Sequence, residues 1–350
     1  MKSGDGVRAI SITTHNGRQV PRIASELNRA DRLGDFKVRL ALGRMRYTIE
    51  PGIYAIGEPT AESPVFVSAN YRLSFNRLRS GLVGHDGWIL VLDTKGINVW
   101  CAAGKGTFGT EELVSRIKSV ALGEIVAHRK LIVPQLGAPG ISAHKVKEQS
   151  GFQVVYGPVR AKDLPAFLDG GMKATEQMRR VDFPFADRIV LIPVELISWG
   201  KHILCAAACL LVLAGLRRGG YSGRLVVSEG VRSVVILLTS YLAAGILGPA
   251  LLPWLPGRAF SAKGAWIGLA ISAALGLQSR PLWKSWSDRL DILAWFLMIP
   301  AVTSFVVMNF TGASTYTSLS GVRREMRIGV PAQLICAVVG FGLWLAGRFV

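Results

Sequence analysis

Cysteine is scarce in this chain of 350 residues. Only four are present: Cys101 stands alone, Cys205 and Cys209 share an apolar segment, and Cys336 lies near the C-terminus. So few and so scattered cysteines form no disulfide framework, which favours a reducing compartment for Cys101. The first residues, MKSGDGVRAISITTHNGR, also lack an apolar core of signal-peptide length. We therefore expect the first part of the chain to lie in the cytoplasm.

Acidic residues are few as well. The 23 Asp and Glu residues stand against 41 Lys and Arg, which gives a formal net charge of +18. Nucleic-acid binding would need a basic face with aromatic residues or a known binding module, and the sequence contains neither. Much of the excess charge lies at the ends of apolar segments, where it would contact lipid headgroups. We exclude nucleic acid as a partner, while an acidic protein partner stays open.

The composition changes near residue 188. The chain before it is mixed and charged, whereas five later stretches approach the roughly 20 apolar residues that span a bilayer. These stretches are residues 196–216, 231–255, 259–277, 290–310 and 330–350. Each is bounded by arginine, lysine, proline or tryptophan, as interfacial anchoring requires. We predict an N-terminal extension (1–60), a soluble domain (61–180), a linker (181–195) and a transmembrane domain (196–350).

Basic residues flank the spans on both sides, so the positive-inside rule does not orient them. We place the soluble domain on the cytoplasmic side of the inner membrane because it lacks an export signal and carries a lone thiol. Within the cores of the spans there are essentially no charged residues beyond Lys201 and His202 near one edge and Lys263 near another. A transport pathway would need more intramembrane charge. Anchoring or partner docking is therefore favoured.

Three residues of the first span share one helix face. His202, Cys205 and Cys209 are spaced i, i+3 and i+7. Imidazole and thiol groups on one stripe could hold a soft metal transiently. Small residues commonly line helix interfaces in membranes, however. Packing is the favoured interpretation for both cysteines.

Between residues 63 and 169, short β-branched runs alternate with helical patterns. We predict strands at 64–68, 88–93, 131–133 and 152–156, and helices after Asn98, after Thr110 as N-cap, at 142–149 and at 164–168. This alternation predicts a parallel sheet with right-handed crossovers. Ligands of such sheets bind beyond the carboxyl ends of the strands. The predicted site therefore lies in the loops at 69–74, 94–110, 134–141 and 157–160. All but the first are rich in glycine or proline, which would let backbone approach a large flat ligand.

The loop after the second strand contains NVWCAAGK, residues 98–105. Asn98 is a good N-cap, which makes Cys101 the third helical residue, and Gly104 is a natural stop. The partial positive charge of a helix start and an uncapped backbone N–H both favour a thiolate there. Cys101 is therefore either a reactive ligand or a buried inert cysteine. GKGT does not complete a phosphate-binding loop, because Val99 and Gly106 occupy positions that need Gly and Ser or Thr.

The segments LVLDTKGINVWCAAGKGTFGTEEL, ANYRLSFNRLR and LGAPGISAHKVKEQSGFQVVYGPVRAKDLPAF resemble the corrinoid-binding domain of the corrinoid iron–sulfur protein large subunit of acetyl-CoA synthesis. This chain lacks that subunit's cluster cysteines. A corrinoid domain joined to about five spans resembles the mercury-methylating corrinoid proteins of anaerobic bacteria and archaea, as does LPGRAFSAKGAWIG between the second and third spans. The resemblance implies a Rossmann-like α/β corrinoid-binding domain followed by an all-α transmembrane domain of about five helices.

The resemblance also implies a cofactor and its contacts. Cys101 resembles the lower axial ligand of cobalt in a cobalamin bound without its own base, and Asn98 would bond the start of the helix beneath the corrin. We expect Cys101 and Asn98 to be the catalytic residues. The expected cofactor contacts are Asn98, Val99, Trp100, Cys101, Ala102, Ala103, Gly104, Lys105, Gly106, Thr107, Asn70, Thr94, Gln135, Gly137, Tyr156 and Gly157.

The implied activity is a methyltransferase that transfers a methyl group from methyl-Co(III) cobalamin to Hg(II), giving methylmercury. A permanent thiolate donor suits delivery of a carbanion or radical to an electrophile, because it opposes the Co(I) product of methyl-cation transfer. The implied partners are a small ferredoxin-like iron–sulfur protein, which donates electrons and could present mercury, and a folate-derived methyl donor. One alternative is a membrane-tethered corrinoid methyl carrier of one-carbon metabolism, which would tolerate loss of Cys101. Another is a non-enzymatic membrane sensor or transporter.

Overall fold

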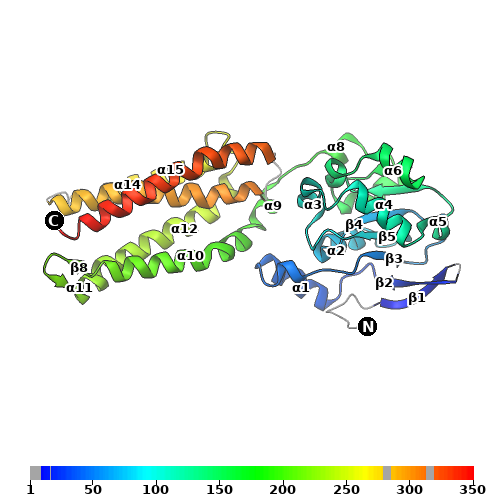
Figure 1. The fold of residues 1–350 in the computed structure, drawn as a ribbon, viewed down its shortest axis with the longest axis horizontal. Helices are drawn as coiled ribbons and strands as arrows, with labels where there is room; N and C mark the ends of the chain where they lie inside the picture. Colours follow the sequence, from blue (N-terminus) through cyan, green and yellow to red (C-terminus); the bar gives the residue numbers. More distant parts are fainter. Residues whose placement is uncertain (1–8, 16, 279–284, 313–318) are drawn as a thin grey trace. The chain divides into compact units, whose positions relative to one another are not determined.

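The computed structural model describes residues 9–15, 17–278, 285–312 and 319–350 (Figure 1). The chain divides into two compact units, the first within residues 1–181 and the second made mostly of residues 182–350. The first unit is an α/β domain, and the second is a helical region with five long apolar helices. The predicted fold class is therefore confirmed.

The first unit is built on one mixed sheet, for which the described residues give seven strands in the order β1-β2-β3-β5-β4-β6-β7. The strands are β1 (Ala9–His15), β2 (Arg18–Ile23), β3 (Gly52–Ile56), β4 (Val65–Ala69), β5 (Gly87–Leu92), β6 (Lys130–Val133) and β7 (Gln153–Tyr156). The last four of these run parallel to one another. β3 pairs antiparallel with β5, and β1 antiparallel with β2. The four predicted strands thus form one parallel group, and β2 and β3 form a further parallel pair.

Helices cover both faces of this sheet. They are α1 (Arg29–Arg39), α2 (Arg72–Ser80), α3 (Val99–Lys105), α4 (Thr110–Ser119), α5 (Leu122–Ile125), α6 (Ala143–Ser150), α7 (Leu164–Asp169) and α8 (Glu176–Arg179). Alternate residues of β5 point to opposite faces. Trp88, Leu90 and Leu92 pack in the core that contains α3, α4 and α6. Ile89 and Val91 pack in the other core, with residues of α2 and α7. Burial on both faces explains the continuous apolar run GWILVL.

Several elements differ from the sequence prediction. The segment predicted as an extension, residues 1–60, contributes β1, β2, β3 and α1, although its residues 1–8 and 16 lie outside the described ones; the predicted domain boundaries themselves stay a prediction. The loop expected at 69–74 already starts α2 at Arg72. Thr110 is the first residue of α4 and not its N-cap, which is Gly109. The Thr110 hydroxyl instead accepts a hydrogen bond from the Ser142 backbone N–H at 2.8 Å. That contact ties α4 to the start of α6.

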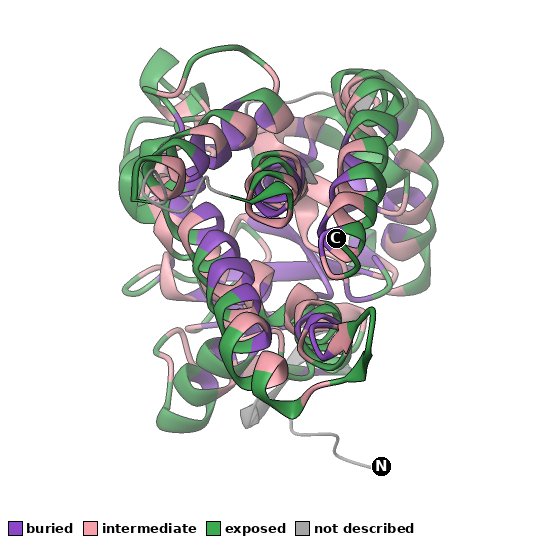
Figure 2. Cartoon of the chain, turned by 90° about the vertical axis from the view of Figure 1, so that its left-hand side faces the viewer, coloured by how far each residue is buried: buried purple, intermediate pink, exposed green. Residues whose placement is uncertain are grey.

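The second unit contains α9 (Phe185–Ile189), α10 (Ile192–Leu213), α11 (Gly223–Leu225), α12 (Val231–Leu251), α13 (Phe260–Gln278), α14 (Trp286–Asn309) and α15 (Leu319–Ala346), with a short hairpin of β8 (Leu216–Arg217) and β9 (Gly220–Tyr221). Five helical stretches are long and apolar enough to cross a membrane: 185–213, 223–251, 260–278, 286–309 and 320–346. Each overlaps a predicted span. The last begins ten residues before the predicted 330, because the polar segment SGVRREMRIG is also helical. In Figure 2 the buried residues of these helices turn toward their neighbours.

Lys263 and Asp291 are buried charged groups of this unit, and both are paired. Lys263 is buried and donates to the backbone carbonyls of Leu252 and Leu255, in the turn that follows α12. Asp291, a charge near a span edge that was not predicted, pairs with Arg232 at 3.0 Å and with Arg348 at 3.2 Å. Lys263 therefore joins α13 to the turn after α12, and Asp291 joins α14 to Arg232 and Arg348.

Cys205 and Cys209 are exposed on α10. The expectation that they pack between helices is thus wrong for this unit. The reason is that α10 turns the face that carries Ala207 and Leu210 toward the other helices.

Candidate functional site

The carboxyl ends of the parallel strands bring the predicted site residues to one edge of the sheet. Asn70 directly follows β4, Thr94 lies two residues after β5, Gln135 lies two residues after β6, and Gly157 directly follows β7. Because neighbouring parallel strands end at the same edge, these four loops meet there. The loop after β5 also contains α3, and α3 carries Cys101. The topology thus collects residues that are up to 87 positions apart in the chain.

Asn98 caps α3, as predicted. Its backbone is extended, with φ −65° and ψ 161°, and its side-chain Oδ1 accepts a hydrogen bond from the Cys101 backbone N–H at 2.9 Å. The expectation of an uncapped Cys101 N–H is therefore wrong, because the cap itself takes that donor. Gly104 does not end the helix either. The helix continues to Lys105, and Gly106 ends it with a left-handed φ of 82°, which glycine adopts without steric cost.

One side of α3 packs into the domain and the other is open. Ala102 and Ala103 are buried in the core. Cys101 is a half-buried free cysteine. Gly104 and Gly106 are exposed, and a Cβ atom added to either would meet nothing within 4 Å. Cys101 is therefore partly accessible, on a helix whose buried side is packed against the core.

Asn70 and Thr94 fix the loop that precedes α3. The Asn70 Oδ1 accepts hydrogen bonds from the Thr94 N–H at 3.1 Å, the Thr94 hydroxyl at 2.8 Å and the Gly96 N–H at 3.0 Å. The Thr94 hydroxyl also lies 2.7 Å from the Ile97 carbonyl oxygen. Both side chains are buried, and these contacts occupy their polar atoms. Their place in the structure indicates that they position α3 and Cys101.

Asp93 and Glu112 join the same loop and were not predicted. The Asp93 backbone N–H donates to the Glu112 carboxylate at 2.9 Å, and the Asp93 carboxylate accepts from the Lys95 backbone N–H at 3.0 Å. A hydrogen bond from the Lys95 ammonium lowers the pKa of Asp93. Lys95 and Gly96 both have positive φ, 58° and 72°. The one sequence signal was an aspartate directly at the end of a buried strand.

The glycine-rich loop after β6 packs against α3. Its 3₁₀ turn covers Gln135–Gly140. A Cβ atom at Gly137 would lie 2.5 Å from the Phe108 ring, and one at Gly140 would lie 2.1 Å from the Phe108 carbonyl oxygen and 3.1 Å from the Ala103 Cα. These glycines were expected to let backbone approach a ligand. They instead let the loop approach α3 and the chain just after it.

Tyr156 and Gly157 support that loop. The Tyr156 hydroxyl donates to the Ile141 carbonyl at 2.8 Å, and burial raises the pKa of Tyr156. The buried Gly157 N–H donates to the Val133 carbonyl at 2.9 Å. Gln135, Val99, Trp100 and Thr107 are half-buried at the edge, and Lys105 is exposed. Of the predicted contacts, these five and the open side of α3 lie where a ligand could reach them.

Gly140→Ala tests the close packing of this loop. We expect the variant to lower the free energy of unfolding of the first unit by about 1–3 kcal/mol, since the added methyl group overpacks Phe108. Gly104→Ala is the matched control, because it has open space and should be neutral or stabilising by about 1 kcal/mol. Hydrogen exchange of the buried amides in the first unit measures the free energy of unfolding of each variant. Equal stability of the two variants would contradict the packing argument.

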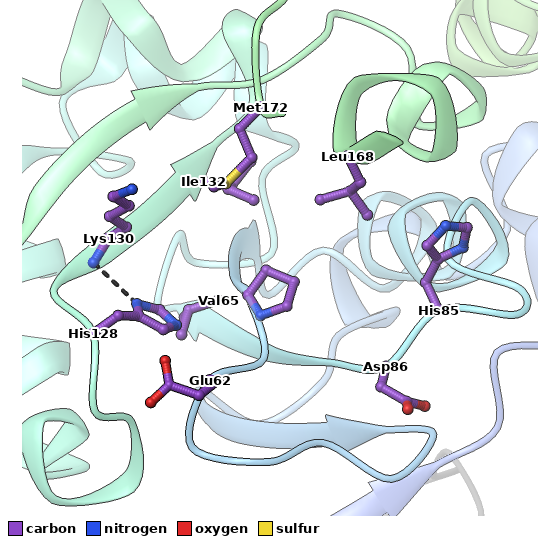
Figure 3. A pocket seen from close by; sticks show the side chains of 10 residues that line it. Glu62, Val65, His85, Asp86, His128, Lys130, Ile132, Leu168 and Met172 are labelled. Carbon is purple, nitrogen blue, oxygen red and sulfur yellow. Dashed lines mark hydrogen bonds between the residues drawn. The ribbon is translucent and has the colours of Figure 1, made fainter. Parts of the chain in front are cut away.

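A separate cavity of about 440 Å³ lies at the opposite edge, by the amino ends of β4 and β6 (Figure 3). It is lined by Glu62, Pro64, Val65, His85, Asp86, His128, Lys130, Ile132, Leu168 and Met172, none of which was predicted as a site residue. His128 accepts from the Lys130 N–H at 3.1 Å, and its other ring nitrogen lies 2.9 Å from the Ser63 carbonyl oxygen. Both nitrogens are engaged, so this imidazole holds the chain around the cavity.

Comparison with known proteins relates the first unit to subunits of one enzyme complex. The family described as CO dehydrogenase/acetyl-CoA synthase delta subunit, CdhD, matches residues 43–168. Acetyl-CoA decarbonylase/synthase complex subunit gamma of Archaeoglobus fulgidus is 32% identical over 123 residues, which are 35% of this chain and 26% of the relative. The same subunit of Methanopyrus kandleri gives the same identity and coverage.

A third relative is the corrinoid/iron-sulfur protein large subunit of Moorella thermoacetica. It is 28% identical over 121 residues, covering 34% of this chain and 27% of the relative. The chain thus spans about a quarter of the length of these curated relatives. The segment from 43 to 168 contains the sheet edge, α3 and Cys101. Residues 43–168 of this chain are therefore similar to CdhD and to acetyl-CoA decarbonylase/synthase gamma subunits, and more distantly to the corrinoid/iron–sulfur protein large subunit.

Proposed function

We propose that the first unit binds a corrinoid at the carboxyl edge of its sheet, with the Cys101 thiolate as the lower axial ligand of cobalt. The observation that carries the proposal is the half-buried Cys101, a free cysteine on the capped start of α3, a helix on which Gly104 and Gly106 are exposed. The relatives support it, because the Moorella protein is named for its corrinoid. The matched segment includes every residue of this edge.

The donor set fits such a cofactor. A corrinoid ring supplies its own nitrogen ligands around cobalt, so the protein needs to add one axial donor, and a thiolate is a soft ligand suited to transition metals. In the described part of the chain, no group of three or more His, Cys, Asp or Glu side chains could hold a bare metal ion. Cys101 would ligate cobalt, and Val99, Trp100, Gly104 and Lys105 would lie beneath the ring.

The reaction proposed is methyl transfer to Hg(II), the substrate, which yields methylmercury. When bound, the corrinoid supplies the cobalt that carries the methyl group. Cys101 would hold the cobalt, and its thiolate would donate electron density to it, which would favour delivery of the methyl group to a soft electrophile such as Hg(II). Asn98 holds the Cys101 backbone, and the Asn70–Thr94 contacts hold the loop before it. These residues keep the thiol in one position through turnover.

Location and partners follow as parts of the same proposal. The five apolar helices would anchor the chain in the inner membrane, with the corrinoid domain in the cytoplasm. Electrons would come from a small ferredoxin-like iron–sulfur protein, which would also present mercury, and the methyl group from a folate derivative. An acidic electron donor would be drawn to a chain of charge +18 during encounter.

A second candidate is a methyl carrier of one-carbon metabolism tethered to the membrane. The relatives favour this reading, because their names place them in acetyl-CoA decarbonylase/synthase complexes. The two candidates differ in their use of Cys101. Methyl-cation transfer does not need the thiolate, whereas transfer to Hg(II) as proposed does.

Reconstitution tests the proposal. The purified full chain, loaded with methylcobalamin, should show a bound-corrinoid absorption spectrum and should release methylmercury when Hg(II) is added. A protein that stays colourless after loading would overturn corrinoid binding. A protein that binds cobalamin and transfers its methyl group to a thiol or tetrahydrofolate, but forms no methylmercury, would support the carrier instead.

Asn98→Ala tests how Cys101 is held. The change removes the bond to the Cys101 N–H and should weaken cobalamin retention about 10–100-fold, as loss of a group that orients a metal ligand does. Asn98→Ser introduces another good N-cap residue and should keep most of the wild-type cobalamin retention. Thr175→Ala removes the corresponding cap bond of α8, to Met178, and should leave retention unchanged. Equal retention in Asn98→Ala and wild type would contradict the role of the cap.

A further inference from the structure

Helix α1 buries two aspartates and exposes its large apolar side chains. Its buried residues are Asp31, Asp35 and Val38. Leu33 and Phe36 point outward and are 53% and 58% exposed. On a helix with 100° per residue, Leu33 and Phe36 lie on the side opposite the buried three. An amphipathic helix on a soluble domain normally buries its leucine and phenylalanine.

Ion pairs hold α1 in this orientation. Asp31 is 1% exposed and pairs with Arg72 at 2.8 Å and Arg79 at 2.6 Å. Asp35 accepts hydrogen bonds from Asn76 at 2.8 Å and from the Tyr47 hydroxyl at 3.1 Å. Turning the helix over would leave these buried charges without partners, which costs several kcal/mol. The outward position of Leu33 and Phe36 is therefore fixed by the fold.

The apolar face continues beyond the helix and is flanked by basic residues. Leu42 and Met45 are 56% and 65% exposed. We call these two together with Leu33 and Phe36 the α1 face. Its neighbours on the helix and in the following turn are Arg29, Arg32, Lys37, Arg44 and Arg46, and none of these side chains pairs with a carboxylate among the described residues. Exposed large apolar residues grouped in this way mark an interaction surface.

We propose that the α1 face lies in the headgroup region of an anionic membrane surface. Apolar side chains on one side of a helix with Lys and Arg along its edges are the composition of interfacial helices. The apolar residues would enter the boundary of the acyl chains, and the cations would contact lipid phosphates. This inference rests on the membrane location proposed above, since the five apolar helices bring a bilayer to this chain.

The charge of the face selects lipid phosphates over other occupants. A second copy of this chain would place like charges opposite one another, which is unfavourable. An acidic protein would satisfy the cations, but four exposed apolar side chains would then need a matching apolar patch on that protein. An anionic bilayer supplies both an apolar interior for the exposed side chains and negatively charged headgroups for the cations.

Photocrosslinking of the full chain tests this proposal. Phe36→p-benzoylphenylalanine is reconstituted in nanodiscs of phosphatidylcholine with phosphatidylglycerol and irradiated, and adducts are identified by mass spectrometry. We expect lipid adducts at position 36. Val83→p-benzoylphenylalanine is the matched control, because Val83 is 51% exposed on a loop of the same unit. It should give at least about tenfold less lipid adduct.

Charge reversal supplies the second measurement. Arg32→Glu with Lys37→Glu, in the Phe36 crosslinker background, should lower the adduct yield about tenfold or more, since each cation near an anionic surface contributes about 1 kcal/mol. Both residues are exposed, so the fold should be kept. Adducts to another protein copy or to this chain itself, or lipid yields equal at positions 36 and 83, would overturn the proposal. A chain that fails to enter nanodiscs would instead overturn the membrane location, and cobalamin loading is read independently of both.

Discussion

Cys101→Ala is expected to lower methylmercury formation by at least about 100-fold. Loss of a group that only orients a metal ligand costs 10–100-fold, so loss of the ligand itself should cost no less. Alanine is a good helix former, and its backbone N–H keeps the bond to Asn98, so α3 should stay folded. The measurement is methylmercury release from protein loaded with methylcobalamin, together with the visible spectrum, which should lose its sulfur-ligated signature.

The exposed cysteines of α10 provide the control for this experiment. Cys209→Ala removes a thiol that is more accessible than Cys101 but lies outside the matched segment 43–168. Its activity and spectrum should equal those of the wild type. If Cys101→Ala keeps full methylmercury formation, the proposed role of the thiolate is wrong. If it keeps methyl transfer to a thiol while its spectrum is unchanged, the carrier of one-carbon metabolism is the better reading.

Asp31→Asn is expected to lower the free energy of unfolding of the first unit by about 3–5 kcal/mol. Removing one partner of a buried ion pair leaves the opposite charge uncompensated, and here two guanidinium groups lose their carboxylate. Hydrogen exchange of the buried amides in β4 and β5 measures this in the full chain. The same variant should release α1 and so reduce lipid crosslinking at position 36.

The Asp31 ion pairs also predict a dependence on pH. Burial by itself raises the pKa of Asp31, but the Arg79 and Arg72 guanidinium groups outweigh it and hold the pKa below its ordinary value of 3.8. A group whose pKa is lowered on folding stabilises the fold above its unfolded pKa and loses that contribution as the pH falls through the folded value. The first unit should therefore lose stability below about pH 4, and Asp31→Asn should lose less.

Glu58→Gln is the matched control for Asp31→Asn. It removes a carboxylate from an ion pair with Arg22 at 3.1 Å, but the Glu58 side chain is 81% exposed. Exposed pairs contribute about 0–1 kcal/mol, so stability should change by no more than about 1 kcal/mol. Equal effects of the two variants would show that α1 is not held by its buried charges.

Several strands and helices could be predicted because their sequence signals lie within a few neighbouring residues. The continuous apolar runs of β4 and β5 and the Asn98 cap of α3 carry their signals within a few residues. The five apolar helices were predictable for the same reason. β3 was missed, since only its last two residues are buried and it lacks the continuous apolar run of β4 and β5.

The roles of single site residues were less predictable. Asn70, Thr94, Gly137 and Gly140 lie at the expected edge, but their polar atoms or small size serve contacts within the protein. A sequence pattern places a residue at an edge and does not say which neighbour its side chain meets. The close approach of the loop after β6 to Phe108 depends on packing between distant segments.

The sequence by itself determined the sheet edge, the cap of α3, the place of Cys101 on that helix and the five apolar helices, because each depends on local periodicity, capping or composition. Only the tertiary structure decided that Asn70 and Thr94 lock the preceding loop and that α1 buries its aspartates. The physical reason is that a buried charge or amide is placed by its partners, and those partners come from elsewhere in the chain. For α1, the ion pairs with Arg72 and Arg79 outweighed the apolar pattern, and this orientation leaves Leu33 and Phe36 outside.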